Sequence, residues 1–437
     1  MSRRTVTAAS AVLLASSFSA FAADAPAVET KPTLPAEAMK AVSPERIKAD
    51  IDKLVSFRTR HTLSPINNPV RGIGAAQKWL LNQFNEANRA NPPKFGMIKA
   101  WTESWSEAPQ ELLPEGANLT SVLGGLRGVA PLAQDNFVYV VAHYDSRNDN
   151  PFDFEGDAPG ANNNASGVAA TLEIARALAN KQLDATVVFF LSSGEEQGLL
   201  GAKYWVQQVM AQDQHIIAVI NLDTIGAPGP AGRNAVSVYS PGLDKSGSSS
   251  QREIRAKLKA ENDSPSRQLA RYFVEIAALE QTAVQPKLVV QADANLPTGD
   301  YTAFLEGGYP SVHLSEATPD AADAVDPAYI ADVARLNAAV IVHLCNAPSA
   351  PKNVRIAPAA TGEATDLQWV ENIERDVAGY EVVWREAAAS AWQHSKNVGL
   401  VTSATLDVKR DDAHFGVRAY DKYGYKSPVA FPVGAKE

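Results

Sequence analysis

The strongest constraint on the fold is an alternation between short apolar runs and helical stretches. Four nearly continuous apolar runs, typical of strands covered on both faces, occupy residues 136–146, 185–196, 215–226 and 308–316. Helical periodicity is found at residues 165–180, 201–212 and 326–344. Because parallel strands need a crossover between them, this alternation predicts an α/β fold: a doubly wound, mostly parallel sheet with helices on both faces.

The N-terminal end is typical of an export signal. Arg3 and Arg4 precede an apolar run, and the Ala-Phe-Ala sequence at 20–22 has the small residues of a cleavage site. The run is short, and no later apolar segment is expected to reach the length that spans a membrane. We therefore expect a signal peptide at residues 1–22 and an exported protein, periplasmic or secreted, without a membrane partner.

Composition shifts divide the rest of the chain. Residues 23–43, rich in Ala and Pro, are expected to form a flexible lead-in, after which Ser43 caps the first helix. An α/β domain is expected over residues 44–347. Period-two alternation then predicts an antiparallel sandwich over residues 350–434, which resembles a fibronectin type III module. The proline-bounded stretch 346–353 favours two units that fold separately.

Charge and cysteine content exclude some classes of protein. The net charge is −9, and no basic cluster follows the first residues, so nucleic acid is not an expected partner. Cys345 is the only cysteine, so no internal disulfide can form.

Polar residues with the chemistry of a metal site follow three of the apolar runs. His143 and Asp145 end the first run, where the imidazole can bind a metal and the carboxylate can orient it. Glu195 and Glu196 end the second run, and their mutual repulsion calls for a cation or a proton, because no basic residue is near them in sequence. Asp223 ends the third run. Ligands collect at this edge of open α/β sheets.

Together with the Pro-Gly-Ala and Ser-Gly residues of the 159–167 loop, these motifs resemble the di-zinc aminopeptidase family, peptidase family 28 of the metallo class. Its relatives include glutaminyl cyclases, glutamate carboxypeptidases and the transferrin receptor ectodomain. The resemblance covers residues 44–347. It implies that His143 and Asp223 bind one zinc, that Glu196 binds the other, and that Glu195 is the general base for hydrolysis of a peptide substrate.

The chain departs from the family pattern at two ligand positions. Asn163 stands where the family has an aspartate that bridges both metals. The histidine that the family places after the 308–316 run is missing, with Ala317 near its position, and His313 is the only substitute but is expected to be a core residue. Tyr301 replaces another family histidine after Asp300, which can still orient its neighbours.

These departures predict a weakened metal centre. Two zinc ions about 3.5 Å apart repel by roughly 19 kcal/mol at an effective dielectric constant near 20, and neutral Asn163 offsets less of this repulsion than a shared carboxylate. We therefore expect one zinc ion rather than two, held by His143, Asp223 and Asn163. The leading hypothesis is an exopeptidase of the aminopeptidase type. A catalytically inactive binding protein is the alternative, and a glutaminyl cyclase ranks third.

The export hypothesis predicts the N-terminus of the mature protein. Sequencing of the exported form is expected to begin at Ala23, because cleavage follows Ala22. Retention of Met1 in the exported fraction would contradict it.

Overall fold

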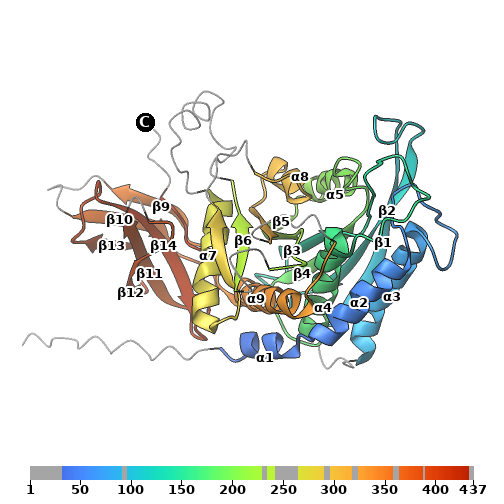
Figure 1. Cartoon of the computed structure of the whole chain (residues 1–437). Helices are drawn as coiled ribbons and strands as arrows, with labels where there is room; N and C mark the ends of the chain where they lie inside the picture. The colour runs from blue at the N-terminus through green and yellow to red at the C-terminus, as the bar shows by residue number, and fades with distance from the viewer. Residues whose placement is uncertain are drawn as a thin grey trace, which may run out of the picture.

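The computed structural model describes residues 32–90, 96–228, 234–241, 264–289, 296–316, 323–357, 364–386 and 389–432, which form an α/β unit and a β-sandwich (Figure 1). The elements of the α/β unit are, in order, α1 (Leu34–Ala41), α2 (Pro44–Ser56), α3 (Ile73–Ala90), β1 (Ile98–Glu107), β2 (Ala117–Leu126), β3 (Asn136–His143), the π-helical turn η1 (Ala161–Ser166), α4 (Gly167–Leu178), β4 (Thr186–Ser192), α5 (Leu200–Ala211), β5 (His215–Leu222), β6 (Ala235–Tyr239), α7 (Pro265–Glu280), β7 (Gln285–Val289), α8 (Tyr301–Glu306), β8 (Ser311–Ser315) and α9 (Pro327–Asn346). The sandwich contains β9 (Lys352–Ala357), β10 (Thr365–Val370), β11 (Val377–Glu386), β12 (His394–Gly399), β13 (Ser403–Leu406) and β14 (Ala413–Asp421).

The α/β unit is built on one mixed sheet. In the described part of the chain its strand order is β1-β2-β4-β3-β5-β8-β6-β7. The central strands β4, β3, β5 and β8 are parallel, as the four apolar runs predicted. The outer strands β1, β2, β6 and β7 were not predicted. Strand β1 shows why: its sequence, IKAWTESWSE, is polar and mostly half-exposed, so it lacks a continuous apolar run.

Helices cover both faces of this sheet, which confirms the doubly wound architecture. On one face α5 and α8 enclose an aromatic cluster that includes Tyr139, Phe190 and Phe304. The other face packs against α2, α3, α4, α7 and α9. By length and composition alone α9 could cross a membrane, contrary to our expectation for the later segments. However, 83% of its most apolar window is buried inside the protein, as in a core helix.

The first described residues differ from the prediction. Ser43 does cap α2, since its side chain accepts a hydrogen bond from the Arg46 backbone N–H. The prediction of a flexible lead-in up to residue 43 is wrong for the last part of that segment, because α1 occupies Leu34–Ala41. This helix forms because Pro35 suits a first turn and the buried Ala38 packs in the core that α9 shares.

The C-terminal strands form two three-stranded antiparallel sheets, ordered β13-β10-β9 and β12-β11-β14 among the described residues. Their facing sides share a core that contains Trp369, Tyr380 and Phe415. The predicted sandwich is therefore confirmed, while its relation to fibronectin type III modules stays a prediction.

The sandwich is docked on the α/β unit beside α7 (Figure 1). Tyr425 belongs to the main core of the α/β unit, and its ring lies 5.4 Å from the ring of His343 in α9. Arg418 in β14 forms an ion pair with Glu275 in α7, and the Tyr272 hydroxyl donates to the Lys426 backbone oxygen at 2.8 Å. Tyr425 therefore extends the core of the α/β unit into the sandwich, while the separate folding of the two units stays a prediction.

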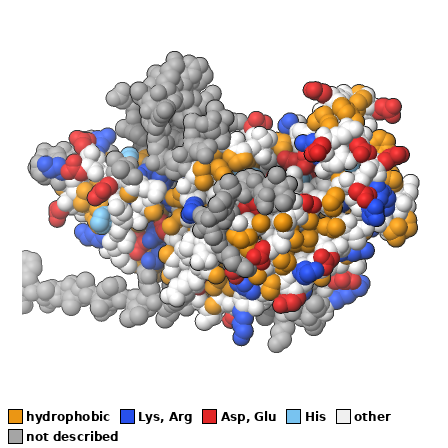
Figure 2. Space-filling view, viewed as in Figure 1, with side chains coloured by type: hydrophobic (Ala, Val, Ile, Leu, Met, Phe, Trp, Pro, Cys, Tyr) orange, Lys and Arg blue, Asp and Glu red, His pale blue; other side chains and the backbone are white. Residues whose placement is uncertain are grey.

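Charges are mixed on the face that Figure 2 shows. Lys and Arg side chains of the described residues are interspersed there with Asp and Glu. The chain as a whole carries a net charge of −9. That nucleic acid is not a partner stays a prediction.

The interface between the two units predicts that substitutions of Tyr425 and Tyr423, which lie in one turn, have different effects on the stability of the protein. Tyr425→Ala is expected to lower the free energy of unfolding by about 3 kcal/mol, because it empties a buried site between the units. Tyr423→Ala, at a position whose side chain is 54% exposed, should change it by less than about 0.5 kcal/mol. Urea unfolding of the full chain measures both. Equal stability of the two variants would mean that the interface contributes nothing.

Candidate functional site

The predicted site residues meet at the carboxyl ends of three parallel strands. His143 is the last residue of β3 and pairs in register with Ser192, the last residue of β4. Glu195 and Glu196 follow β4, and Asp223 follows β5. The sheet therefore brings together residues that are far apart in sequence.

His143 is at the centre of the site. Its Nε2 lies 3.0 Å from Asn163 Oδ1, 3.6 Å from Asp223 Oδ1 and 3.9 Å from Glu195 Oε2. Its Nδ1 faces Asp145, 3.2 Å from the backbone oxygen and 3.6 Å from Oδ1. The ring is buried, and Asp145 orients it through Nδ1. As a result, Nε2 points at three oxygen atoms that can act as metal ligands.

Asp145 also fixes the glutamate pair. Its carboxylate accepts the backbone N–H groups of Glu195 at 3.3 Å and Glu196 at 3.1 Å. The predicted supporting role of Asp145 therefore extends to the turn that carries the proposed base.

The three consecutive asparagines have different roles. Asn162 is buried, accepts the Gly226 N–H and donates to Glu316. Asn164 is also buried and donates to the Leu222 oxygen at the end of β5. Asn162 and Asn164 thus hold the loop in place, and the exposed Asn163 between them faces His143.

A buried arginine and an aspartate hold the loop that carries these asparagines. The Arg60 guanidinium donates to the backbone oxygens of Tyr144, Pro159 and Gly160 at 2.8, 2.6 and 3.0 Å. Asp323 accepts the N–H groups of Ala161 and Asn162 at 2.8 and 2.6 Å. The four residues that precede Asn163 are thus held by two side chains from other parts of the chain.

Glu196 has a basic partner that the sequence analysis missed. Arg147 Nε donates to Glu196 Oε2 at 2.5 Å, and the amide of Asn163 donates to Glu196 Oε1 at 2.9 Å. Along the chain, no basic residue lies close to the two glutamates. The available signal was that Arg147 follows Asp145 by two residues at the end of the neighbouring strand.

The electrostatics of the site favour a cation. Burial by itself lowers the pKa of His143, but the carboxylates of Glu195 and Asp223 raise that pKa well above its ordinary value. Burial raises the pKa of Glu195 well above its ordinary value. The field that holds a proton on His143 can instead hold a metal ion, because both are positive charges.

The remaining predicted residues lie around this centre. Asp300 is buried, accepts a hydrogen bond from the Ser192 hydroxyl, and has its pKa raised to about 7 by burial. His313 is buried against the rings of Tyr301 and Tyr239, with Nδ1 2.9 Å from the Asn221 amide nitrogen, and burial lowers its pKa to about 4. It therefore has the surroundings of a core histidine. Ala317 lies outside the described residues.

These residues fit one zinc ion. Three possible ligand atoms converge: the imidazole nitrogen of His143, a carboxylate oxygen of Asp223 and the amide oxygen of Asn163. Nitrogen and oxygen atoms of these kinds are suitable ligands for zinc. His143, Glu195 and Glu196 also have ligand atoms within 4.8 Å of one another. The Glu196 side fits a second ion poorly, because both of its oxygens already have donors.

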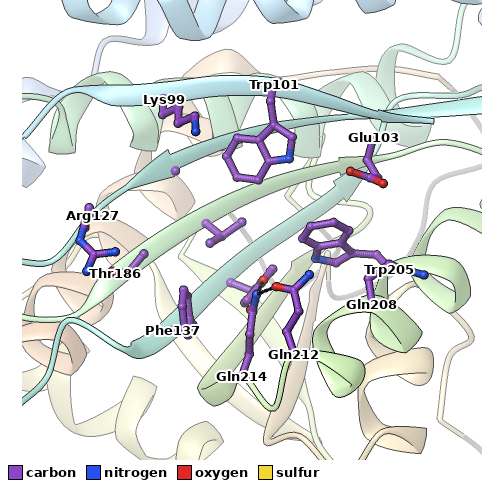
Figure 3. A pocket seen from close by; sticks show the side chains of 13 residues that line it. Lys99, Trp101, Glu103, Arg127, Phe137, Thr186, Trp205, Gln208, Gln212 and Gln214 are labelled. Atoms are coloured by element: carbon purple, nitrogen blue, oxygen red, sulfur yellow. Dashed lines mark hydrogen bonds between the residues drawn. The ribbon is translucent and has the colours of Figure 1, made fainter.

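A separate pocket of about 440 Å³ lies far from this chemistry (Figure 3). It is lined by Trp101, Trp205, Phe137 and Thr186, among others. Phe137 and Thr186 lie at the amino ends of β3 and β4, opposite the strand ends that carry His143 and Glu195. This pocket is therefore not part of the candidate metal centre.

Comparisons with known proteins agree with this geometry. The model of peptidase family M28 matches residues 121–337. A probable zinc metalloprotease of Pyrenophora tritici-repentis is 34% identical, over 93% of this chain and 89% of that protein. One from Pyricularia oryzae is 36% identical, over 90% of this chain and 83% of that protein.

Solved structures support the fold alone. LapB from Legionella pneumophila has a TM-score of 0.53 at 18% identity and covers 73% of this chain and 77% of its own. An aminopeptidase from Aneurinibacillus sp. strain AM-1 has a TM-score of 0.50 at 13% identity, with 71% and 96% covered. The resemblance predicted from the motifs is confirmed: the chain belongs to peptidase family M28.

Proposed function

We propose that this protein is an exported zinc-dependent aminopeptidase with a one-metal centre. One observation carries the proposal: the donor atoms of His143, Asn163 and Asp223 converge beside the carboxylate of Glu195. The side chains of Glu195 and Asp223 are 14% and 12% exposed, so a peptide can reach them from solvent. The similarity to probable zinc metalloproteases and, in fold, to an aminopeptidase supports the same class.

Zinc, when bound by His143, Asp223 and Asn163, supplies a Lewis acid that polarises the scissile carbonyl and makes water more acidic. Glu195 accepts the proton of the attacking water and returns it to the leaving amine. The raised pKa of Glu195 suits this role, since a base must hold the proton between the two steps. Asp145 keeps both the imidazole and the backbone of Glu195 in place.

A binding protein without activity remains the second candidate. The observation that favours it is the ion pair of Arg147 with Glu196, which occupies a residue that the family uses as a metal ligand. Such a protein would keep the fold and the peptide-binding face without hydrolysis. Metal-dependent turnover distinguishes the two.

Glu195→Gln tests the proposal. The full chain is expected to hydrolyse peptides with a free N-terminus but not their N-acetylated forms, to lose activity with a chelator, and to regain it with zinc. The Glu195→Gln variant should lose activity by roughly 100-fold or more, because the amide cannot accept the proton. Its bound zinc, measured by elemental analysis, should be unchanged.

Glu155→Gln is the matched control, since Glu155 is an exposed glutamate on a loop near the same end of the sheet. It should keep full activity. An unmodified protein that binds zinc but hydrolyses none of these peptides would favour the binding protein instead.

A further inference from the structure

We propose that the Arg147 guanidinium takes the place of a second metal ion, so that the centre is built for a single zinc. This inference rests on the proposed zinc-dependent function. It assigns a role to a residue that lies outside the zinc ligands and the general base.

A continuous chain of polar contacts crosses the centre. His143 Nε2 lies 3.0 Å from Asn163 Oδ1, and Asn163 Nδ2 donates to Glu196 Oε1 at 2.9 Å. Glu196 Oε2 then accepts from Arg147 Nε at 2.5 Å. The positive end of this chain is the guanidinium, which binds the Glu196 oxygen that Asn163 does not contact.

The amide of Asn163 suits this arrangement and a carboxylate would not. Its oxygen faces the His143 side, where a cation is held, and its N–H faces the Glu196 carboxylate. An aspartate at this position would place two carboxylates in contact, which is stable only with a cation between them. Asn163 and Arg147 are therefore matched substitutes for a bridging carboxylate and a metal ion.

The charge of the centre leads to the same conclusion. The carboxylates of Asp145, Asp223, Glu195 and Glu196 surround the centre, and the Arg147 guanidinium offsets one of their charges. An aspartate at 163 without the arginine would make the same centre more negative by two charges. That difference equals the charge of one further divalent cation.

The burial of the pair allows the guanidinium to act as a fixed charge. The Glu196 side chain is only 9% exposed, while that of its partner Arg147 is 38% exposed. A carboxylate this buried needs a persistent partner, unlike the exposed ion pairs of the surface.

Zinc stoichiometry of the full-length mature chain tests the inference. After dialysis against dilute zinc, elemental analysis is expected to give one zinc per chain for the unmodified protein and two for the Arg147→Ala/Asn163→Asp double variant. By titration calorimetry the second ion should bind the double variant on the order of 100-fold more tightly than the unmodified protein. Arg147→Lys, which keeps the positive charge, should retain one zinc.

Arg58→Ala is the matched control, because Arg58 also pairs with a carboxylate, that of Asp157, but does not contact the centre. It should bind one zinc. Should the double variant fail to fold in a thermal melt, Arg147→Ala alone replaces it, and its second-ion affinity should still exceed that of the unmodified protein.

A second-ion affinity that Arg147→Ala leaves unchanged would overturn the inference and leave the proposed function intact. Two zinc ions in the unmodified protein would overturn the inference and the one-metal part of the proposed function, but not the zinc-dependent hydrolysis. No bound zinc and no activity in the unmodified protein would overturn both.

Discussion

The site depends on the parallel register of β3, β4 and β5. Because His143 pairs with Ser192 and Val141 pairs with Asn221, the three strands end at one level, and the residues that follow them face one another. Burial on both faces keeps that register, since a slip of one residue would move every side chain to the opposite face. The loop with Asn163 is then tied to this edge by Arg60 and by Asp323.

The next constraint is electrostatic. The strands place several carboxylates around one buried imidazole, and such an arrangement needs positive charge to be stable. Arg147 supplies part of that positive charge. The carboxylates of Glu195 and Asp223 favour further positive charge at His143, from a proton or from a metal ion. We propose that this division lets a member of peptidase family M28 keep its fold with the neutral amide of Asn163 at the centre of the site.

Much of this could be predicted from the sequence, and the exceptions have physical reasons. Strands buried on both faces are continuous apolar runs, so the central sheet and the positions of His143, Glu195 and Asp223 could be found. Strand β1 is half-exposed and polar, and α1 is stabilised by tertiary packing. The local pattern of apolar residues therefore predicted neither element. Arg147 was missed because its partner Glu196 lies on another strand end, and only the sheet brings them together.

The most direct test of the one-metal centre is a crystal structure of the zinc-loaded full-length protein, with anomalous diffraction recorded on both sides of the zinc absorption edge. One anomalous peak is expected, about 2.0–2.2 Å from His143 Nε2 and from an oxygen of Asp223, with Arg147 still bound to Glu196. A second peak of equal height beside Glu196, with the guanidinium displaced, would contradict the account.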